Sequence, residues 1–254
     1  SRGTPMRLGA LLGPIDPTNP DALAEQAKQL EAEGYDSLWS AQAVGRGNFM
    51  TDPFIALATA AAVTNRVELG TAILQLPLYH PTDIASKAYS LMQPSANRLL
   101  LGLGAGSTQA DHDVHGKDFA ARFRQFNESL TELKQIFAGG EPSEQLSAWQ
   151  QVAAGPPLLY GTWGKGVARA ANEFDGWIAS GMNKTPDDLA KALPAYREAG
   201  GTRAMVSTIL LTADHTLADI KNLLGRYNEI GFDDAIVMFL PGAPASAAVR
   251  DLSN

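Results

Sequence analysis

Residues 67–107 read VELGTAILQLPLYHPTDIASKAYSLMQPSANRLLLGLGAGS. The first part, Val67–Leu74, is an apolar run typical of a β-strand, and the prolines that follow it do not fit a central strand. Pro81 then opens a stretch with apolar residues at helical spacing. Leu99–Leu103 is a second apolar run, of the kind seen in parallel strands that are covered on both faces. The stretch therefore predicts a strand–helix–strand unit that ends in a glycine-rich turn.

The rest of the chain repeats this alternation. Amphipathic stretches such as Arg122–Phe137 begin near a cap or proline and end before glycine, as helices do. Strands that alternate with helices pair in parallel through right-handed crossovers. About eight such units favour a closed (β/α)8 barrel of the α/β class over an open doubly wound sheet. The strands are predicted at Arg7–Leu12, Ser37–Ser40, Val67–Leu74, Leu99–Leu103, Leu158–Gly161, Gly176–Ser180, Ala204–Leu211 and Ala235–Leu240.

One connection of the predicted barrel is long. Between Leu103 and Leu158 the chain holds the predicted helix Arg122–Phe137 and a polar stretch rich in Gly, Pro, Ser and Gln. Loops of this length in a compact domain are often functional lids. We find no linker, so residues 1–254 are expected to form a single domain with an insertion between the fourth and fifth strands. Residues 1–5 are expected to be an irregular leader.

Composition limits the classes of function. The net charge of −7 argues against nucleic acid or an anionic membrane as the main partner. The absence of cysteine excludes disulfides, thiolate metal sites and cysteine nucleophiles. No apolar run approaches the ~20 residues of a membrane span, and no secretory signal opens the chain. We therefore expect a cytoplasmic protein with a small-molecule substrate.

The predicted strand exits carry little reactive chemistry, although barrel active sites lie at the C-terminal ends of strands. They are rich in glycine and poor in acids and bases. No lysine falls inside a predicted strand, which counts against Schiff-base chemistry, and no exit pairs two carboxylates for sugar hydrolysis. A site lined by such residues has no strong nucleophile of its own, so it suits a bound cofactor that performs the difficult chemistry.

The exit of the predicted fifth strand is the best phosphate candidate. There an apolar strand meets a helix, whose first N–H groups and partial positive charge attract anions. Thr162 and Lys165 add a hydroxyl and a cation, and Trp163 is placed for stacking or lid packing. The alternative is an ordinary strand-to-helix turn, and the same alternative holds for Gly102–Gly106. The candidate turn is Gly161-Thr162-Trp163-Gly164-Lys165.

The histidines and Trp39 each allow a functional and a structural interpretation. His112 and His115, beside Asp111, imitate metal-ligand spacing, but nothing downstream completes a site. We expect them to be exposed loop residues and expect no metal site. His80 either faces a ligand or makes a hydrogen bond at a helix start. Trp39 is more typical of a barrel core than of a cofactor platform.

Three blocks resemble the bacterial luciferase-like family of flavin-dependent oxidoreductases. They read GTAILQLPLYHP at 70–81, NRLLLGLGAGS at 97–107 and PPLLYGTWGKGVARAANEFDGWIASG at 156–181. The resemblance spans nearly the whole predicted barrel. It implies a (β/α)8 barrel that binds FMN, or in one branch the deazaflavin coenzyme, at its C-terminal face.

The resemblance also implies which residues hold the cofactor. The family's third strand ends in a bulge with a non-prolyl cis peptide that supports the ring system, and this bond falls within one residue of Ala72–Ile73. The turn Gly104–Ser107 borders the cofactor, and Gly161–Lys165 matches the phosphate-binding turn. The expected cofactor-binding residues are Ala72, Ile73, Gly104, Gly106, Ser107, Gly161, Thr162, Trp163, Gly164 and Lys165.

The chain departs from the family pattern at three positions. Many relatives carry a histidine near the reaction centre after the second strand, and here Gln42 is the nearest polar substitute. Gln42 and His80 are the candidate catalytic residues. Ala105 stands where the luciferase branch has arginine, and Ser107 where some deazaflavin enzymes have glutamate. These differences argue against light emission and sugar-phosphate dehydrogenation.

The sequence thus predicts an FMN-type monooxygenase that uses reduced flavin and oxygen on a small organic substrate. A flavin reductase as supplier of reduced flavin and a homodimer are what the resemblance suggests for its partners. Hydride transfer with the deazaflavin coenzyme is the alternative within the family. From other classes, a non-catalytic flavin-binding barrel and a phosphate-binding barrel isomerase or lyase stay open.

Overall fold

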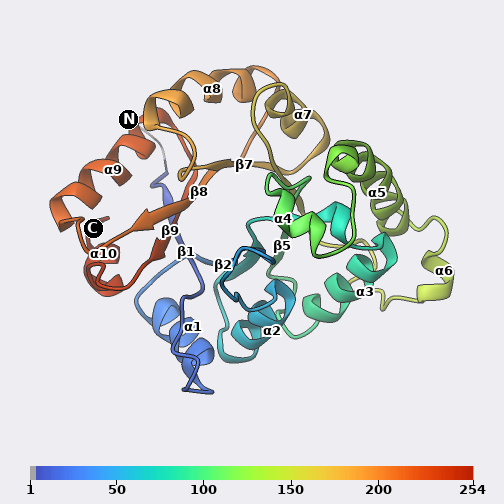
Figure 1. The fold of residues 1–254 in the computed structure, drawn as a ribbon, viewed down its shortest axis with the longest axis horizontal. Coiled ribbons are helices and arrows are strands. Elements are labelled where there is room, and N and C mark those ends of the chain that lie inside the picture. Colours follow the sequence, from blue (N-terminus) through green and yellow to red (C-terminus); the bar gives the residue numbers. More distant parts are fainter. Residues whose placement is uncertain (1–3, 254) are drawn as a thin grey trace.

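A computed structural model describes residues 4–253, which form a closed (β/α)8 barrel (Figure 1). The strand order is β3-β2-β1-β9-β8-β7-β6-β5-β4, and a further pairing of β3 with β5 closes the ring. All of these pairings are parallel, so the predicted fold is confirmed. The strands are β1 (Arg7–Leu11), β2 (Ser37–Ser40), β3 (Glu68–Thr71), β4 (Leu74–Gln75), β5 (Leu99–Gly104), β6 (Leu158–Gly161), β7 (Gly176–Ser180), β8 (Ala204–Leu211) and β9 (Asp234–Phe239).

The predicted strand Val67–Leu74 is wrong as a single element, because it is divided into β3 and β4. The peptide bond between Ala72 and Ile73 is cis, at the position that the resemblance implied. After Thr71 the chain leaves the β2–β3 ladder, and Thr71 Oγ1 donates a hydrogen bond to the Gly102 carbonyl at 2.7 Å. β4 then pairs with the upper part of β5 alone.

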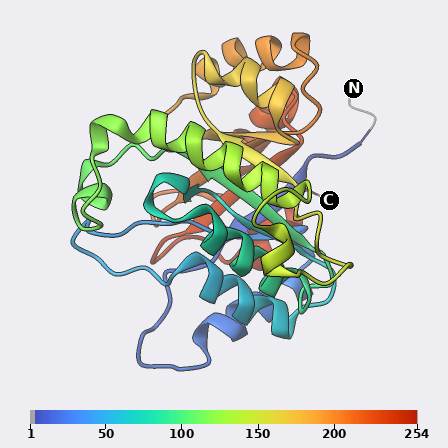
Figure 2. The same cartoon turned by 90° about the vertical axis from the view of Figure 1, so that its right-hand side faces the viewer.

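Helices surround the barrel, and the predicted helix Arg122–Phe137 is α5 with the same bounds. Figure 2 shows α5 crossing the outer face of the molecule beside α3, against which it packs. Within residues 4–253 no helix has both the length and the apolar character needed to cross a membrane. The helices are α1 (Ala22–Ala32), α2 (Pro53–Val63), α3 (Pro81–Met92), α4 (Gln109–Asp113), α5 (Arg122–Phe137), α6 (Ser143–Leu146), α7 (Gly166–Glu173), α8 (Pro186–Glu198), α9 (Leu217–Ile230) and α10 (Ser246–Asp251), with short 3-10 turns η1 (Leu76–Leu78) and η2 (Phe119–Ala121).

The barrel interior is filled around Trp39, as predicted for a core residue. Its side chain is fully buried, and its Nε1 donates to Ser37 Oγ at 2.8 Å. Gly9 and Gly70 make room for the ring, because a Cβ at Gly70 would lie 2.2 Å from it. Alternate residues of each strand face outward and pack under the helices. The interior cluster consists of Leu11, Trp39, Ala72, Leu100, Leu159, Ile178, Met205 and Ile236.

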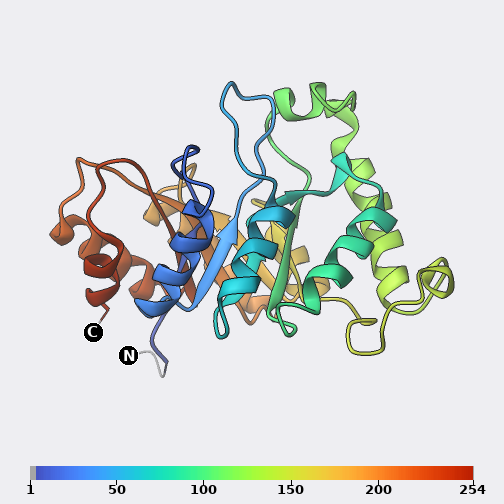
Figure 3. The ribbon, with the colours of Figure 1, turned by 90° about the horizontal axis from the view of Figure 1, so that it is seen from below.

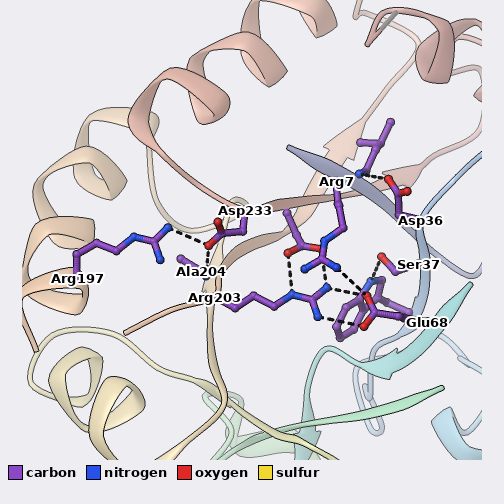
Figure 4. Close-up of polar contacts among 11 residues, drawn as sticks. Arg7, Asp36, Ser37, Glu68, Arg197, Arg203, Ala204 and Asp233 are labelled. Atoms are coloured by element: carbon purple, nitrogen blue, oxygen red, sulfur yellow. Dashed lines mark hydrogen bonds and ion pairs between the residues drawn. The ribbon is translucent and has the colours of Figure 1, made fainter. Parts of the chain in front are cut away.

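An ion cluster closes the N-terminal end of the barrel (Figure 4). Arg203 contacts both carboxylate oxygens of Asp234 and of Glu68 at 2.8–3.1 Å. Arg7 adds a second cation, with its Nε 3.4 Å from Asp234 Oδ2. All four residues stand at or next to the start of a strand. The cluster therefore leaves only the opposite end of the barrel as a candidate mouth.

Candidate functional site

The C-terminal ends of the strands form a mouth with an apolar floor. The segments that follow β2 and β5 rise from this end, opposite the two chain termini (Figure 3). Ala41, Ile73 and Met238 are partly exposed and pack on the interior cluster from this side. A ligand that rests on the top of the barrel therefore meets an apolar surface.

Ile73 is seated between two of the predicted glycines. A Cβ at Gly104 would lie 2.6 Å from Ile73 Cδ1, and a Cβ at Gly161 would lie 2.5 Å from Ile73 Cγ2. Side chains at either position would displace Ile73. The structure thus brings the exits of β4, β5 and β6 together around one side chain. Gly106 and Ser107 continue from Gly104 toward the surface, where Gly106 is half-buried and Ser107 exposed.

The turn from Gly161 to Lys165 fits an anion. Trp163, Gly164 and Lys165 are exposed, and a Cβ at Gly164, where φ is +63°, would meet no atom within 4 Å. No side chain caps the N-terminus of α7, whose positive dipole end faces this turn, although the Gly166 and Val167 N–H groups donate to the Trp163 and Gly164 carbonyls at 3.3 and 3.2 Å. Lys184 Nζ lies 4.7 Å from the centre of the Trp163 ring and adds a cation beside the turn. Thr162 attaches the turn to the core, because its carbonyl accepts a hydrogen bond from Trp177 Nε1 at 2.9 Å.

Both the nitrogen and the oxygen of the Gln42 side-chain amide are hydrogen-bonded within the protein. Its Nε2 donates to the Tyr79 hydroxyl at 2.6 Å, and its Oε1 accepts from the Gln75 backbone N–H at 2.8 Å. Burial, followed by the negative charge of Asp52, raises the pKa of Tyr79 to about 12. An amide neither donates nor takes up a proton near neutral pH. Gln42 can therefore orient the neutral phenol of Tyr79, but it is not itself an acid or base.

His80 is the N-cap of α3. Its Nδ1 accepts a hydrogen bond from the Thr82 backbone N–H at 3.1 Å, and its side chain is exposed. Of the two interpretations of this residue, the hydrogen bond at a helix start is the one present. Its assignment as a catalytic residue stays a prediction.

The prediction that His112 and His115 are exposed loop residues is confirmed for His115 and wrong for His112, which is fully buried together with its neighbour Asp111. The Asp111 carboxylate accepts hydrogen bonds from Arg46 Nε and Nη2 at 3.0 and 2.6 Å. It also accepts from Gln75 Nε2 at 2.6 Å and from the Val44 N–H at 3.3 Å. Burial alone would raise the pKa of Asp111, but these hydrogen bonds outweigh it and lower the pKa below 3.8. Asp111 thus ties the insertion to the exits of β2 and β4.

Sequence reasoning missed Gln75, Tyr79 and Asp111 because their partners are remote in the chain. The contacts of Asp111 with Gln75 and Arg46 span 36 and 65 residues. Arg46, in the segment after β2, is a signal that could have suggested a carboxylate partner. Among residues 4–253, no three or more histidine and carboxylate side chains gather where they could hold a metal ion.

Three surface cavities lie apart from the predicted cofactor-binding residues. One of 250 Å³ lies between α1 and the connection from β9 to α10. The other two, of 260 and 220 Å³, lie where residues 146–157 pass over α3. None of the three is lined by a predicted cofactor-binding residue. The strand exits, and not these cavities, therefore define the candidate site.

Comparison with known families identifies this architecture. The model of the family described as luciferase-like monooxygenase matches residues 4–238. The chain belongs to the luciferase-like monooxygenase family. The predicted resemblance is therefore confirmed, and members of this family named as monooxygenases and as coenzyme F420-dependent oxidoreductases are among its relatives.

Two relatives are similar to this chain in sequence, and one solved structure is similar to it in fold. A 4-hydroxyprotoasukamycin monooxygenase of Streptomyces nodosus subsp. asukaensis is 35% identical over 148 residues, which cover 56% of this chain but only 40% of that protein. A putative coenzyme F420-dependent oxidoreductase of Mycobacterium tuberculosis is 28% identical and covers 87% of this chain and 72% of its own length. The oxygenating constituent of 3,6-diketocamphane monooxygenase from Pseudomonas putida, solved in complex with FMN, has a TM-score of 0.67 at 20% identity, over 88% of this chain and 73% of that one.

Within this luciferase-like barrel, the predicted cofactor residues fall into two groups. Ile73, Gly104 and Gly161 meet at the floor, and Ala72 lies just beneath it in the interior cluster. Trp163 and its exposed neighbours form the rim of the same β6 exit. An apolar floor beside an exposed turn at the start of a helix would suit a flat ring that carries a phosphate group.

Proposed function

We propose that this luciferase-like protein is a reduced-flavin monooxygenase that binds FMN at its strand exits and oxidises a small organic substrate. The observation that carries the proposal is the apolar floor formed by Ala41, Ile73 and Met238. A floor of this kind excludes water and provides no nucleophile, so the reaction depends on a cofactor. Reduced FMN supplies the electrons that activate oxygen.

The chain's own residues would hold and orient the cofactor. Ala72 and Ile73 would support the ring, and Gly104, Gly106 and Ser107 would border it. The turn Gly161–Lys165 would hold the phosphate through backbone N–H groups, the Thr162 hydroxyl and the Lys165 ammonium. Tyr79, whose hydroxyl is contacted by Gln42 and whose pKa is raised to about 12, would offer a hydrogen-bond donor toward a developing negative charge.

The deazaflavin coenzyme is the second candidate cofactor. It is favoured by the relative named as a putative coenzyme F420-dependent oxidoreductase, which aligns with 87% of this chain. Deazaflavin enzymes transfer hydride and do not activate oxygen, so the two functions differ in whether oxygen is consumed. A flavin reductase partner and a homodimer stay predictions.

Two measurements separate these functions. Titration of the protein with FMN and, separately, with the deazaflavin coenzyme, followed by visible absorbance and fluorescence, identifies the cofactor. Oxygen uptake is then measured with reduced FMN and a panel of small organic substrates. Substrate-dependent oxygen uptake is expected. Binding of the deazaflavin coenzyme alone would replace the proposal by hydride transfer, and FMN binding without turnover of any substrate would favour the non-catalytic barrel.

A further inference from the structure

Thr208 has a backbone conformation that threonine rarely adopts. Its φ angle is +57°, in the left-handed region, and of the four non-glycine residues with positive φ among residues 4–253 it alone is β-branched. The residue lies in β8 at a bulge, where the pairing with β9 shifts between Val206 and Ile209. Bulges are over-represented next to active sites, where they re-aim a side chain, and strained residues cluster at such sites too.

The bulge leaves Thr208 open to the mouth of the barrel. Val206 and Ile209 both pack in the outer core beneath the helices, whereas Met205 belongs to the interior cluster. Ser207 and Thr208 therefore lie between two outward-facing residues. Helices α8 and α9 pack together outside β8 (Figure 1), so solvent does not reach the middle of this strand from the outer side. Thr208 is nevertheless partly exposed, and the mouth is the opening that exposes it.

Thr208 carries the accessible one of the two hydroxyls in the bulge. Ser207 is 2% exposed, and its Oγ is sealed inside the barrel, out of reach of a ligand. The Thr208 hydroxyl, by contrast, belongs to a partly exposed residue and has no hydrogen-bond partner among residues 4–253. A hydroxyl both donates and accepts, so it can bind either a carbonyl or an N–H group. It is therefore available to a group from outside the protein.

Thr208 stands across the barrel from Ile73. In the ring of strands, three strands separate β8 from β3 on one side and from β4 on the other, so β8 lies opposite the divided strand that carries Ile73. Met238 of the apolar floor is on the neighbouring β9, where it pairs with Leu210, two residues beyond Thr208. A flat molecule that lies across this floor would thus have an apolar side chain under one edge and a hydroxyl at the other.

We infer that the Thr208 hydroxyl binds the polar edge of the cofactor ring, through a hydrogen bond to a carbonyl or imide N–H group. This inference rests on the proposed function, since it takes the molecule on the floor to be the flavin. A neutral hydroxyl suits the uncharged carbonyl and imide groups that a flavin ring carries along one edge. Ile73, on the opposite side, suits the rest of the ring. The bulge therefore determines which way round the ring lies on the floor.

Two substitutions separate the hydroxyl from the strain. Thr208→Val keeps the shape of the side chain and removes only the hydroxyl, so it should melt like the wild type and bind oxidised FMN about tenfold more weakly in a fluorescence titration. Thr208→Gly removes the hydroxyl and the strain together, because glycine adopts positive φ without cost. It should lose the same affinity but melt about 2–4 °C above the wild type. Weaker binding by a more stable protein is the result expected of a residue that is strained for binding.

Ser147→Gly is the matched control. Ser147 also has a positive φ, of +47°, but it is exposed and lies beyond α6, apart from the predicted cofactor-binding residues. This variant should keep the FMN affinity of the wild type. The deazaflavin coenzyme serves as a second probe, and the same losses are expected with it.

Undiminished affinity of Thr208→Val would overturn the inference, as would an equal loss in Ser147→Gly. A Thr208→Gly protein that melts well below the wild type would show that the fold itself requires threonine there, which overturns it too. If the wild type binds neither FMN nor the deazaflavin coenzyme, the proposed function fails, and the inference fails with it.

Discussion

Replacement of Arg203 by methionine measures how far the ion cluster stabilises the barrel. Arg203 is 17% exposed, and its guanidinium satisfies Asp234, which is fully buried, and Glu68, which is 30% exposed. Methionine keeps an unbranched chain of similar length but offers no donor. Asp234 would then be left with Arg7 as its remaining cation, 3.4 Å away.

The expected loss follows from the burial of the carboxylates. Removal of one partner from a buried ion pair costs about 3–5 kcal/mol, because the other charge stays desolvated. Glu68 is partly exposed and regains water, so we expect the lower end, about 3 kcal/mol. Since 1 kcal/mol lowers the melting temperature of a domain of this size by about 2–4 °C, Arg203→Met should melt about 6–12 °C below the wild type.

Thermal unfolding followed by circular dichroism is the assay. Arg226→Met is the matched control, because the Arg226–Asp187 pair is 47% and 78% exposed. Exposed pairs contribute about 0–1 kcal/mol, so this variant should melt within about 4 °C of the wild type. FMN affinity should be the same in all three proteins, since the cluster lies at the end opposite the mouth. A melting temperature of Arg203→Met no lower than that of Arg226→Met would refute the reasoning.

Three further substitutions test the turn, the insertion and the core. Gly164→Glu should weaken FMN binding by about 100-fold or more, because the new carboxylate repels the phosphate. The circular dichroism spectrum should stay the same, since a Cβ at this position would meet no atom within 4 Å. Undiminished FMN affinity would show that this turn is not part of the site. Asp111→Asn should lower the free energy of unfolding by about 1–3 kcal/mol at pH 7. Folding lowers the pKa of Asp111 from 3.8, so the ionised carboxylate stabilises the fold above about pH 4 and this stabilisation is lost as the pH falls below that. In urea unfolding, the difference in unfolding free energy between wild type and Asp111→Asn should therefore be smaller at pH 3 than at pH 7. An equal difference at both pH values would contradict the assignment. Gly70→Ala should cost about 1–3 kcal/mol or more by clashing with Trp39. Gly225→Ala, in open space on α9, should be neutral or stabilising by up to about 1 kcal/mol, and equal effects of the two changes in urea unfolding would refute the packing argument.

The barrel itself was predictable because its signals are local. Apolar runs, caps and glycine stops depend on residues a few positions apart, and α5 therefore matched its predicted bounds. The division of the third strand was not visible in this pattern, since Val67–Leu74 is apolar throughout. It depends on which neighbouring strand each half pairs with, and β4 pairs with β5 alone.

The site was predictable only in part. Gly104 and Gly161 were predicted from their spacing and from the resemblance. The sequence did not show why glycine is needed there, which is that both positions lie against Ile73 from a third strand end. His112 was expected to be exposed because its spacing with His115 completes no metal site, and nothing local in the sequence indicates that His112 and Asp111 are buried. The partners that bury Asp111 come from the segment after β2 and from β4.

Alternation of short apolar and amphipathic segments was enough to specify a (β/α)8 barrel and the end at which ligands bind, because periodicity and chain direction are properties of neighbouring residues. The polar contacts of Gln42, Gln75 and Asp111, and the seating of Ile73, required the folded barrel. Parallel strands bring their exits to one rim whatever their separation along the chain, and burial at that rim decides which side chains find partners and which are left without one.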